Sequence, residues 1–557
     1  MSDEYAKQIK SAEAVGALGN DLFGEKVNLY TGSTEFTVTD VSLRGNNSLP
    51  VAIGRRYTVQ PRLEIDSFYR PFGDWDFDIP HLQGIFGGAW LTRAGTRRCN
   101  VSAYEAIPPK VTYQDASFDG IEYWSGNHLY VPGQGSQEML LTVPENTHRP
   151  TDGSTYLWVT ANHWYFSCIP DPNGGDAFLA IAPDGTRYWF DWLATRSYPA
   201  LEKGTNVPTG MMASKASGNG KKGRVTPTIF AGYRMPRNEA WLMPTRVEDR
   251  FGNWVTYTYD AANRWQLKQI LASDGRQLTV TYNASGVVST VSDGTRTWTY
   301  NAGASTLSSV TLPDGSQWQY ALGSLNAEME TSEGGMCDGL YLPGTESYTG
   351  TMVHPSGATG QFTFKGALHG RSYVTRVCYE IVGGSASYTA RYAKEFAQLA
   401  IQQKTISGPG LTTAQWTYSY GPTNDSFSDE CPTACPTTKT VEVSGPDSQW
   451  IRYTFGNKFL DTDGKLVQVE TGTGPTNILR IETTSYLTDP TGQNYPSRIG
   501  HSPYTRSDRT AERHAPMVQR QTTQQGRVFT WQVEQVNGIY DMDQLARPTK
   551  VTKSSGQ

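Results

Sequence analysis

The sequence predicts an all-β protein in which successive β-hairpins join into one large, curved or spiralling antiparallel sheet, a partial or complete β-shell. Turn formers are abundant, since 56 Gly and 31 Pro occur among 557 residues, and both residue types favour turns over helices. Aromatic residues make up 12% of the chain, with 31 Tyr and 15 Trp, and aromatic side chains favour strands. The third observation is a hairpin pattern that repeats after residue 226. A short N-terminal helix is the one helical element that we expect.

The charge balance argues against one large class of function. The chain carries 48 Lys and Arg against 53 Asp and Glu, a formal net charge of −5, so it lacks the basic surplus that neutralises phosphates. We therefore expect no nucleic-acid partner. The longest apolar run, at residues 177–182, is too short to span a membrane. Residues 1–10 are polar and lack the apolar centre of a signal peptide.

We expect six segments along the chain. They are a helical arm at 1–20, an N-terminal β region at 21–200, a flexible Gly/Ser/Lys-rich linker or loop at 201–226, hairpin repeats at 227–325, a β insert of unknown type at 326–440, and further degenerate repeats at 441–557. Ser2 can cap the helix of the arm, which we expect over residues 2–18. Residues 203–224 are basic and lack periodicity, which is typical of a solvated loop.

Turn signals recur at a nearly constant spacing in the repeat segment. Asp-Gly pairs stand at Asp274–Gly275, Asp293–Gly294 and Asp314–Gly315. Each turn precedes an alternating strand that ends in Tyr, and in the first units a second turn opened by Asp or Asn follows that Tyr. The structural positions predicted in these repeats, including a last unit near the C-terminus, are Gly252, Tyr259, Asp260, Asn263, Asp274, Gly275, Tyr282, Gly286, Asp293, Gly294, Tyr300, Asp314, Gly315, Tyr320, Tyr540 and Asp541.

A hairpin of about twenty residues cannot bury its apolar face alone, so neighbouring hairpins must pair side by side. Tyr257 and Tyr259 are two residues apart and therefore point to the same face of their strand; Val280 and Tyr282 share this spacing. We expect the aromatic residues to hold the wall together and the turn Asp and Gly residues to set its register. Asn263 is expected to take a left-handed backbone conformation, which Asn tolerates.

The segment from Thr245 to Arg264 resembles the repeat of the RHS/YD-repeat family. It contains Gly252-Asn253 followed by Tyr259-Asp260-Ala-Ala-Asn263-Arg264. Residues 27–57, with Val27-Asn28-Leu29 and Arg55-Arg56-Tyr57, are similar to the segment that precedes RHS repeats in many bacterial members. Related families are the C components of insecticidal toxin complexes, bacterial polymorphic toxins and animal teneurins. The resemblance implies a large strand-built shell that, in toxins, encloses a C-terminal effector.

The sequence departs from the toxin members in two ways. After Tyr282 and Tyr300 the residue is Asn, whereas the family motif has Asp. The self-cleaving, aspartyl-protease-like segment that often ends the shell is not recognisable, nor is an effector. We therefore expect a fragment of a longer protein, a natural split subunit or a short member of the family.

Asp74, Asp76 and Asp78 alternate along one expected strand and so share a face. Clustered carboxylates can bind Ca²⁺, and two of them can form a glycosidase pair. The simpler interpretation is a solvated face with the intervening aromatic residues buried. His163 lies in an aromatic stretch, and we interpret it as a packed core histidine. Because the other histidines lack ligand spacing and no phosphate-binding motif occurs, we predict no catalytic residue, no metal and no cofactor.

Six cysteines, at positions 99, 168, 337, 378, 431 and 435, allow too many pairings for the sequence to choose among. Cys431 and Cys435 can close a small disulfide or remain reduced in a loop, and both interpretations stay open. Gly335-Met-Cys337-Asp-Gly339 matches a nucleophile elbow with Cys in place of Ser, but the required strand and helix are missing around it. We interpret Cys337 as a structural or disulfide cysteine, with Cys378 as a candidate partner.

The function that we predict is a non-catalytic scaffold that encapsulates or presents another polypeptide. The resemblance places it in a bacterial toxin-delivery or interbacterial-competition protein, secreted or at the cell surface, whose partner is an enclosed effector or a second chain. The first alternative is a secreted adhesin with exposed aromatic residues that stack on sugars. The second is a carbohydrate-active enzyme that uses Asp74 and Asp76.

Overall fold

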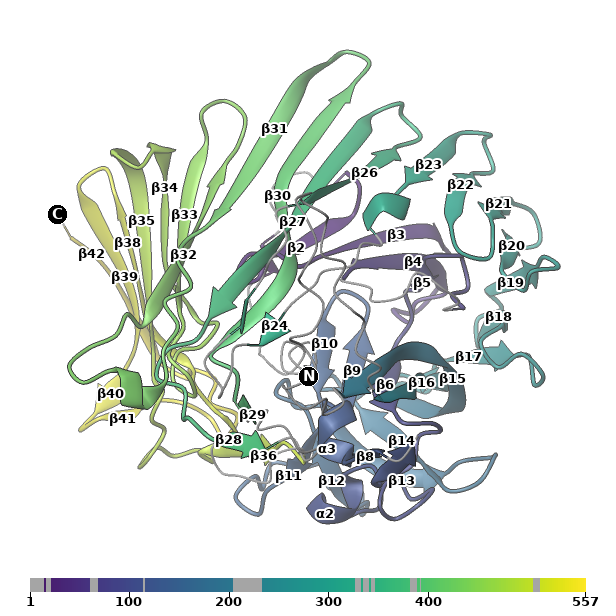
Figure 1. Ribbon diagram of the computed structural model, residues 1–557, viewed down its shortest axis with the longest axis horizontal. Helices are drawn as coiled ribbons and strands as arrows, with labels where there is room; N and C mark the ends of the chain where they lie inside the picture. The colour runs from purple at the N-terminus through teal and green to yellow at the C-terminus, as the bar shows by residue number, and fades with distance from the viewer. Residues whose placement is uncertain are drawn as a thin grey trace, which may run out of the picture.

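The computed structural model describes residues 15–16, 22–60, 69–113, 116–203, 233–325, 332–333, 340–341, 346–380, 388–390, 392–503 and 511–556 (Figure 1). Strands dominate these residues, and the described α-helices, α2 (Ala103–Ala106) and α3 (Gly120–Tyr123), have a single turn each. The all-β prediction is confirmed. The predicted helix at 2–18 is wrong where it is described, because Val15–Gly16 form strand β1 and pair with β2. The rest of that helix, the loop at 204–232 and Cys337 lie outside the described residues.

From β15 onward the chain builds the greater part of one large antiparallel sheet, and we call this part the wall. Its strands pair in chain order, so each hairpin extends the sheet by two strands. Figure 1 shows them as an arc that runs from teal through green to yellow. The strands are β15 (Arg187–Lys203), β16 (Tyr233–Glu248), β17 (Trp254–Tyr259), β18 (Leu267–Ala272), β19 (Gln277–Tyr282), β20 (Val288–Ser292), β21 (Thr297–Ala302), β22 (Leu307–Thr311), β23 (Gln317–Ala321), β26 (Ser347–Val353), β27 (Thr359–Gly370), β30 (Glu395–Gly408), β31 (Leu411–Tyr420), β32 (Thr438–Ser444), β33 (Trp450–Gly456), β34 (Leu466–Gly474), β35 (Asn477–Tyr486), β38 (Met517–Gln524), β39 (Arg527–Val533) and β42 (Val551–Gly556).

A second group of strands lies at the foot of the wall, and we call it the base. It consists of β6 (His81–Phe86), β9 (His128–Val131), β10 (Gly135–Glu138), β11 (Leu140–Thr142), β12 (Tyr156–Val159), β13 (Tyr165–Pro170) and β14 (Asp176–Ile181). β14 continues into β15 of the wall, and β6 pairs with β16. β11 pairs with β36 (Arg498–His501), which follows β35 in the chain. The base therefore connects the first and the late hairpins of the wall, far apart in sequence.

The concave side of the wall holds a separate small sheet, which we call the N-terminal sheet. Its strands are β1, β2 (Glu25–Asn28), β3 (Thr34–Ser42), β4 (Ala52–Val59) and β5 (Asp76–Phe77). In Figure 1 its purple strands lie inside the arc. Its apolar side chains share one buried core with the wall strands from β15 to β33, in which Phe36 packs against Phe362 with ring centroids 4.8 Å apart. The wall thus encloses part of its own chain.

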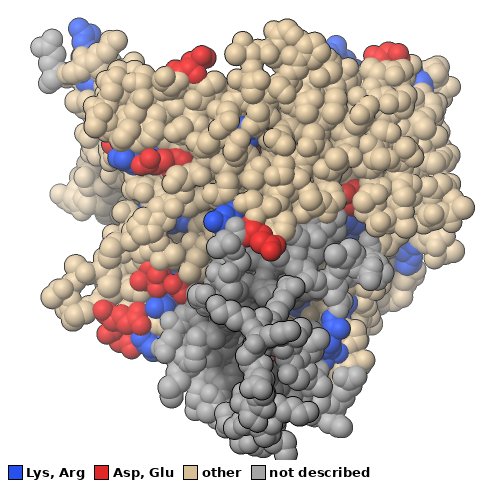
Figure 2. All heavy atoms as spheres, turned by 45° about the horizontal axis from the view of Figure 1, so that its top comes forward, with Lys and Arg blue, Asp and Glu red and all other residues tan. Residues whose placement is uncertain are grey.

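The two faces of the wall differ in chemistry because side chains alternate along each strand. Toward the N-terminal sheet the strands present apolar and aromatic residues that are fully buried, such as Ile270 and Val291. The outer face carries hydroxyls and amides; Thr281, Thr290 and Thr299 stand opposite one another across three strands. Figure 2, which brings the top of Figure 1 forward, shows charged side chains in small, separate groups among mostly uncharged residues.

Candidate functional site

The candidate site is the inner side of the wall, where the repeat residues meet the N-terminal sheet. The first turn of each repeat has the geometry that the sequence predicts. In Asp274–Gly275, Asp293–Gly294 and Asp314–Gly315 the Gly has a φ of 85°, 94° and 84°, a region that strongly favours Gly. Each Asp carboxylate accepts the backbone N–H two residues further on. These and neighbouring hydrogen bonds lower the pKa of all three aspartates.

The second turn is also held by its opening residue, with one correction. Asp260 accepts the backbone N–H groups of Ala262 and Asn263 at 2.9 and 2.8 Å, and Gly286 has the expected positive φ of 77°. Asn263 does not take the left-handed conformation that we predicted, since it is not among the residues with positive φ. Its N–H is instead bound by the Asp260 carboxylate, so the turn closes without a strained residue.

The last repeat uses a different aspartate from the one expected. Tyr540 ends the short strand β41 (Ile539–Tyr540), and the backbone of Asp541 makes hydrogen bonds with Glu534 and Thr549. The turn carboxylate is Asp543, which accepts the backbone N–H of Arg547 at 2.9 Å and its Nε at 2.7 Å. Asp543 is not among the predicted repeat positions, although an Asp four residues before Arg547 was a signal in the sequence.

Repeat tyrosines join successive hairpins through their hydroxyl groups. The Tyr259 hydroxyl donates to the carbonyl oxygen of Pro244 at 2.9 Å, and that of Tyr282 donates to Leu267 at 2.8 Å. The same bond recurs later in the wall, from Tyr420 to Ile401 and from Tyr486 to Leu466. All four acceptor residues lie where the strand register shifts at a β-bulge, and a bulge interrupts ladder hydrogen bonds. The tyrosine hydroxyl therefore satisfies a carbonyl at that irregularity.

Two repeat tyrosines make a different bond, because the N-terminal sheet lies over them. The Tyr300 hydroxyl donates to Asp40 Oδ2 at 2.8 Å, and Arg55 Nη2 donates to the Tyr320 hydroxyl at 2.8 Å. Asp40 and Arg55 form a two-bond ion pair at 2.6 and 2.8 Å, and neither side chain is exposed to solvent. Burial opposes the charge of Arg55, but Asp40 raises its pKa above the ordinary value. The sequence predicted both tyrosines but not their partners.

The chain around the N-terminal sheet also binds backbone groups at the bulges of the wall. The N–H groups of Val288, Leu307 and Ile401 each lie at a register shift. Val288 N–H donates to the carbonyl of Pro71 at 2.8 Å, and Ile401 N–H donates to that of Gly32 at 3.0 Å. Leu307 N–H donates to a carboxylate oxygen of Asp74 at 2.8 Å. At each of these bulges, a backbone N–H group of the wall therefore donates to an acceptor in the N-terminal part of the chain.

Asp74, Asp76 and Asp78 do not form the solvated face that we predicted. Asp74 is 2% and Asp76 5% exposed, and each carboxylate fastens the N-terminal segment to a different element. Asp76 binds the guanidinium of Arg196 in β15, and the Asp78 carboxylate accepts the Tyr130 hydroxyl in the base at 2.6 Å. Burial opposes ionisation of Asp76, but Arg196 holds its pKa below the usual range.

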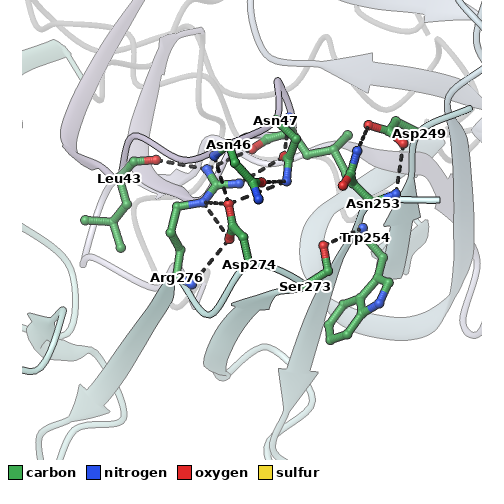
Figure 3. Close-up of polar contacts among 10 residues, drawn as sticks. Leu43, Asn46, Asn47, Asp249, Asn253, Trp254, Ser273, Asp274 and Arg276 are labelled. Atoms are coloured by element: carbon green, nitrogen blue, oxygen red, sulfur yellow. Dashed lines mark hydrogen bonds and ion pairs between the residues drawn. The ribbon is translucent and has the colours of Figure 1, made fainter. Parts of the chain in front are cut away.

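A clasp at the tip of one repeat turn binds the loop between β3 and β4 (Figure 3). Arg276 Nη1 donates to the carbonyls of Leu43 and Leu49 at 3.0 and 3.1 Å, and its Nη2 donates to Asn47 Oδ1 at 3.0 Å. Asp274 Oδ2 accepts the backbone N–H of Asn46 at 3.2 Å. The repeat turn therefore binds a segment more than two hundred residues away in the sequence.

A buried polar cluster holds the strand end near Tyr30. Lys439 Nζ donates to the Tyr30 carbonyl at 2.8 Å and lies 2.8 Å from His369 Nδ1. The Tyr30 hydroxyl donates to Asp463 Oδ1 at 2.7 Å. Lys439 and His369 are both 1% exposed, and burial lowers the pKa of Lys439 to about 7 and that of His369 well below its usual value.

The remaining candidates have structural positions. Cys431 and Cys435 form a disulfide, and a second disulfide joins Cys99 to Cys168 across 69 residues, a pairing that the sequence did not specify. His163 is not a core residue of a strand; it lies half-buried in the turn before β13 with a φ of 60°. Within the described residues, no group of His, Cys, Asp or Glu is arranged to hold a metal ion, and no helix there has the length and hydropathy to cross a membrane.

The fold and the site define a class of protein: an all-β wall of tyrosine-linked hairpins that closes over a sheet of its own chain. A scan against family models finds no match, and neither does a search of the curated proteins. Among solved structures, the chain is similar to TcdB2-TccC3, with 9% identity and a TM-score of 0.29 over 98% of this chain. It spans 37% of that structure's chain.

A second similar structure is the N-terminal domain of the effector protein SpvB from Salmonella typhimurium strain LT2. The identity is 11% and the TM-score 0.15, over 70% of this chain and 95% of that domain.

Proposed function

We propose that this protein is a non-catalytic YD-repeat scaffold whose wall encloses or presents another polypeptide. The observation that carries the proposal is that the concave face of the wall binds polypeptide: it holds the five-stranded N-terminal sheet. The contacts are those a surface uses to bind a folded chain, namely an apolar core, bulge N–H groups and tyrosine hydroxyls. The scaffold belongs, in this proposal, to a bacterial toxin-delivery or interbacterial-competition protein.

The polar groups of the site support a structural role. Asp40 and Asp76 are neutralised by Arg55 and Arg196, and the hydroxyls of Tyr259 and Tyr300 donate to fixed acceptors within the protein. An acid or base catalyst must reach substrate, whereas these carboxylates are buried and fully engaged in binding the N-terminal segment. The glycosidase alternative at Asp74 and Asp76 therefore has no support from the geometry.

The disulfides support export. Disulfide bonds persist in secreted and cell-surface proteins and are rare in the cytosol of most organisms. Cys99 and Cys168 join two parts of the base that are 69 residues apart. We therefore place the protein outside the cytosol, at the cell surface or in the medium.

Co-expression tests the encapsulation. The chain is produced together with the polypeptide encoded immediately downstream of it, and the mixture is passed over a sizing column and digested with trypsin. We expect the two to elute together and the partner to resist trypsin at least tenfold longer than the free partner does. Separate elution, or digestion of the partner at its free rate, would contradict the proposal. Specific glycan-array binding without a polypeptide partner would favour the adhesin.

A further inference from the structure

The inner face of the wall changes its chemistry where the N-terminal sheet ends. Up to β33 the inward side chains belong to the shared buried core, as Val441 and Phe455 do. The register continues the same face from Val441 through Tyr453, Val469 and Glu482 to the last strands. From β35 onward this face carries charged or exposed residues at several inward positions, whereas Val518 and Val533 on the same face stay buried in a separate small cluster. This face of β35, β38, β39 and β42 is called the late inner face below.

The late inner face is cationic. It contains four cations and one carboxylate, at Arg480, Arg520, Arg527, Lys553 and Glu482, placed by the pairing of successive strands. The Arg480 and Arg520 side chains are each 49% exposed, although both approach Glu482, at 2.8 and 3.9 Å. The whole chain, by contrast, has a net charge of −5. The late inner face therefore has an excess of three positive charges that the protein as a whole does not have.

An aromatic side chain stands among these cations. Phe529 is 45% exposed, and it lies opposite Thr522 on β38 and Ser555 on β42. The outer face of the same strands is uncharged along a row that crosses the sheet, in which Gln521 and Thr530 are neighbours. The charged side chains and the exposed aromatic side chain of these strands thus both lie on the concave side. This is the side on which the wall already binds the N-terminal sheet.

We propose that the late inner face docks an acidic, extended polypeptide segment of the enclosed partner. This inference deepens and rests on the proposed function. Two observations select that occupant: the charge of the face is complementary to carboxylates, and the face continues the interface that holds the N-terminal sheet. A strand with acidic residues at alternate positions places a carboxylate about every 7 Å on one side. That spacing fits cations distributed on both sides of Glu482, and apolar residues of the strand can contact Phe529.

Peptide binding to the full chain tests the docking. The probe is a fluorescein-labelled 13-residue peptide of alternating Glu and Val, followed by fluorescence anisotropy at 50 and 300 mM NaCl. We expect binding that weakens with salt, because exposed ion pairs are screened. The same peptide with Lys in place of Glu should not bind, and a 12-nucleotide single-stranded DNA should bind more weakly. Equal or tighter binding of either control would overturn the proposal.

The variant R520Q/K553Q removes two cations of the late inner face. Because an exposed ion pair contributes about 0.2–1 kcal/mol, the double variant should bind the acidic peptide about three- to tenfold more weakly. The matched control is K268Q/R296Q, which removes the same charge from half-exposed side chains of the repeats, paired with Asp260 and Asp293. It should bind like the parent. Equal loss in both variants, or loss in neither, would overturn the proposal.

The peptide assay and the co-expression assay can fail independently. If the downstream polypeptide co-elutes equally with the parent and with R520Q/K553Q, the partner docks elsewhere; the late inner face is then wrong and the encapsulating scaffold stands. If no partner co-elutes with the parent while R520Q/K553Q alone loses the acidic peptide, the surface stands and the proposed function is wrong.

Discussion

Replacing Arg276 by Ala tests whether the clasp holds the N-terminal sheet against the wall. The change removes the three charge-assisted hydrogen bonds that Arg276 donates to the loop, to the carbonyls of Leu43 and Leu49 and to Asn47. It also removes the ion pair with Asp274 of the same turn. Each such bond contributes roughly 1.5–3 kcal/mol when buried, but the loop around Asn47 is partly exposed, so water replaces part of each bond. We expect R276A to lower the free energy of unfolding by about 2–3 kcal/mol.

Arg296 is the matched control, because it occupies the corresponding turn of the next hairpin. Its side chain is 54% exposed and pairs with Asp293 of the same turn at 2.7 Å. Since an exposed ion pair contributes about 0.2–1 kcal/mol, R296A should cost less than 1 kcal/mol. Urea unfolding followed by tryptophan fluorescence measures both variants. If R276A destabilises the protein no more than R296A does, the clasp does not hold the sheet and the reasoning is refuted.

Gly45 offers a second route to the same clasp. A Cβ atom at this position would lie 2.2 Å from Arg276 Nε and 2.3 Å from Asp274 Oδ2, so Gly45→Ala must displace the guanidinium. Because G45A and R276A break the same contacts, their effects should be strongly non-additive in a double-mutant cycle. Additive effects in urea unfolding would show that the loop and the turn act independently.

Three further predictions concern the wall and the base. Tyr420→Phe should lower the free energy of unfolding in urea by about 1 kcal/mol, because the Tyr420 hydroxyl donates a hydrogen bond. Tyr418→Phe should be neutral or stabilising, since the buried Tyr418 hydroxyl has no hydrogen-bond partner within the described chain. Equal costs in the two variants would contradict this prediction. Burial lowers the folded-state pKa of Lys439 to about 7, so between pH 7 and 9 the unfolded chain holds more protons than the folded chain. Over that range the free energy of unfolding of the parent should therefore rise by about 2 kcal/mol relative to that of Lys439→Met. A constant difference between the two proteins across that range would refute the prediction. Replacing Cys99 and Cys168 by Ser opens a link across 69 residues and should cost about 4 kcal/mol in thermal unfolding, more than opening the disulfide that spans four residues.

The wall does not enclose an empty space, because the N-terminal sheet occupies part of its concave side. Its core with the wall runs from β15 to β33, so this stretch of the concave face is already filled. A partner that enters the same concavity must therefore contact the late inner face or displace the sheet. Displacement would separate the buried Asp76–Arg196 ion pair and the hydrogen bonds of Asp40 and Arg55 to Tyr300 and Tyr320, and buried polar groups that lose their partners are costly. That cost favours binding beside the N-terminal sheet.

Local features of the wall could be predicted because their causes are local. The Asp-Gly turns and the opening Asp260 follow from the hydrogen bonds that a short polar side chain makes with the next residues of the backbone. Strand faces follow from the two-residue alternation of side chains, which places Tyr257 and Tyr259 on the same face; both lie in the buried core. Asn263 was misplaced because a carboxylate bond to its N–H closes the turn in a conformation that any residue adopts.

The sequence by itself thus determined the hairpin unit, its turns and the all-β class, since these depend on residues within about twenty positions of one another. Only the tertiary structure decided what the wall encloses and which partners Tyr300 and Tyr320 bind. It also decided that the carboxylates of Asp74 and Asp76 are buried and bind the N-terminal segment to the wall. The same holds for the pairing of Cys99 with Cys168. The physical reason is that such contacts join residues up to hundreds of positions apart, and a single contact of this kind leaves no periodic pattern in one sequence.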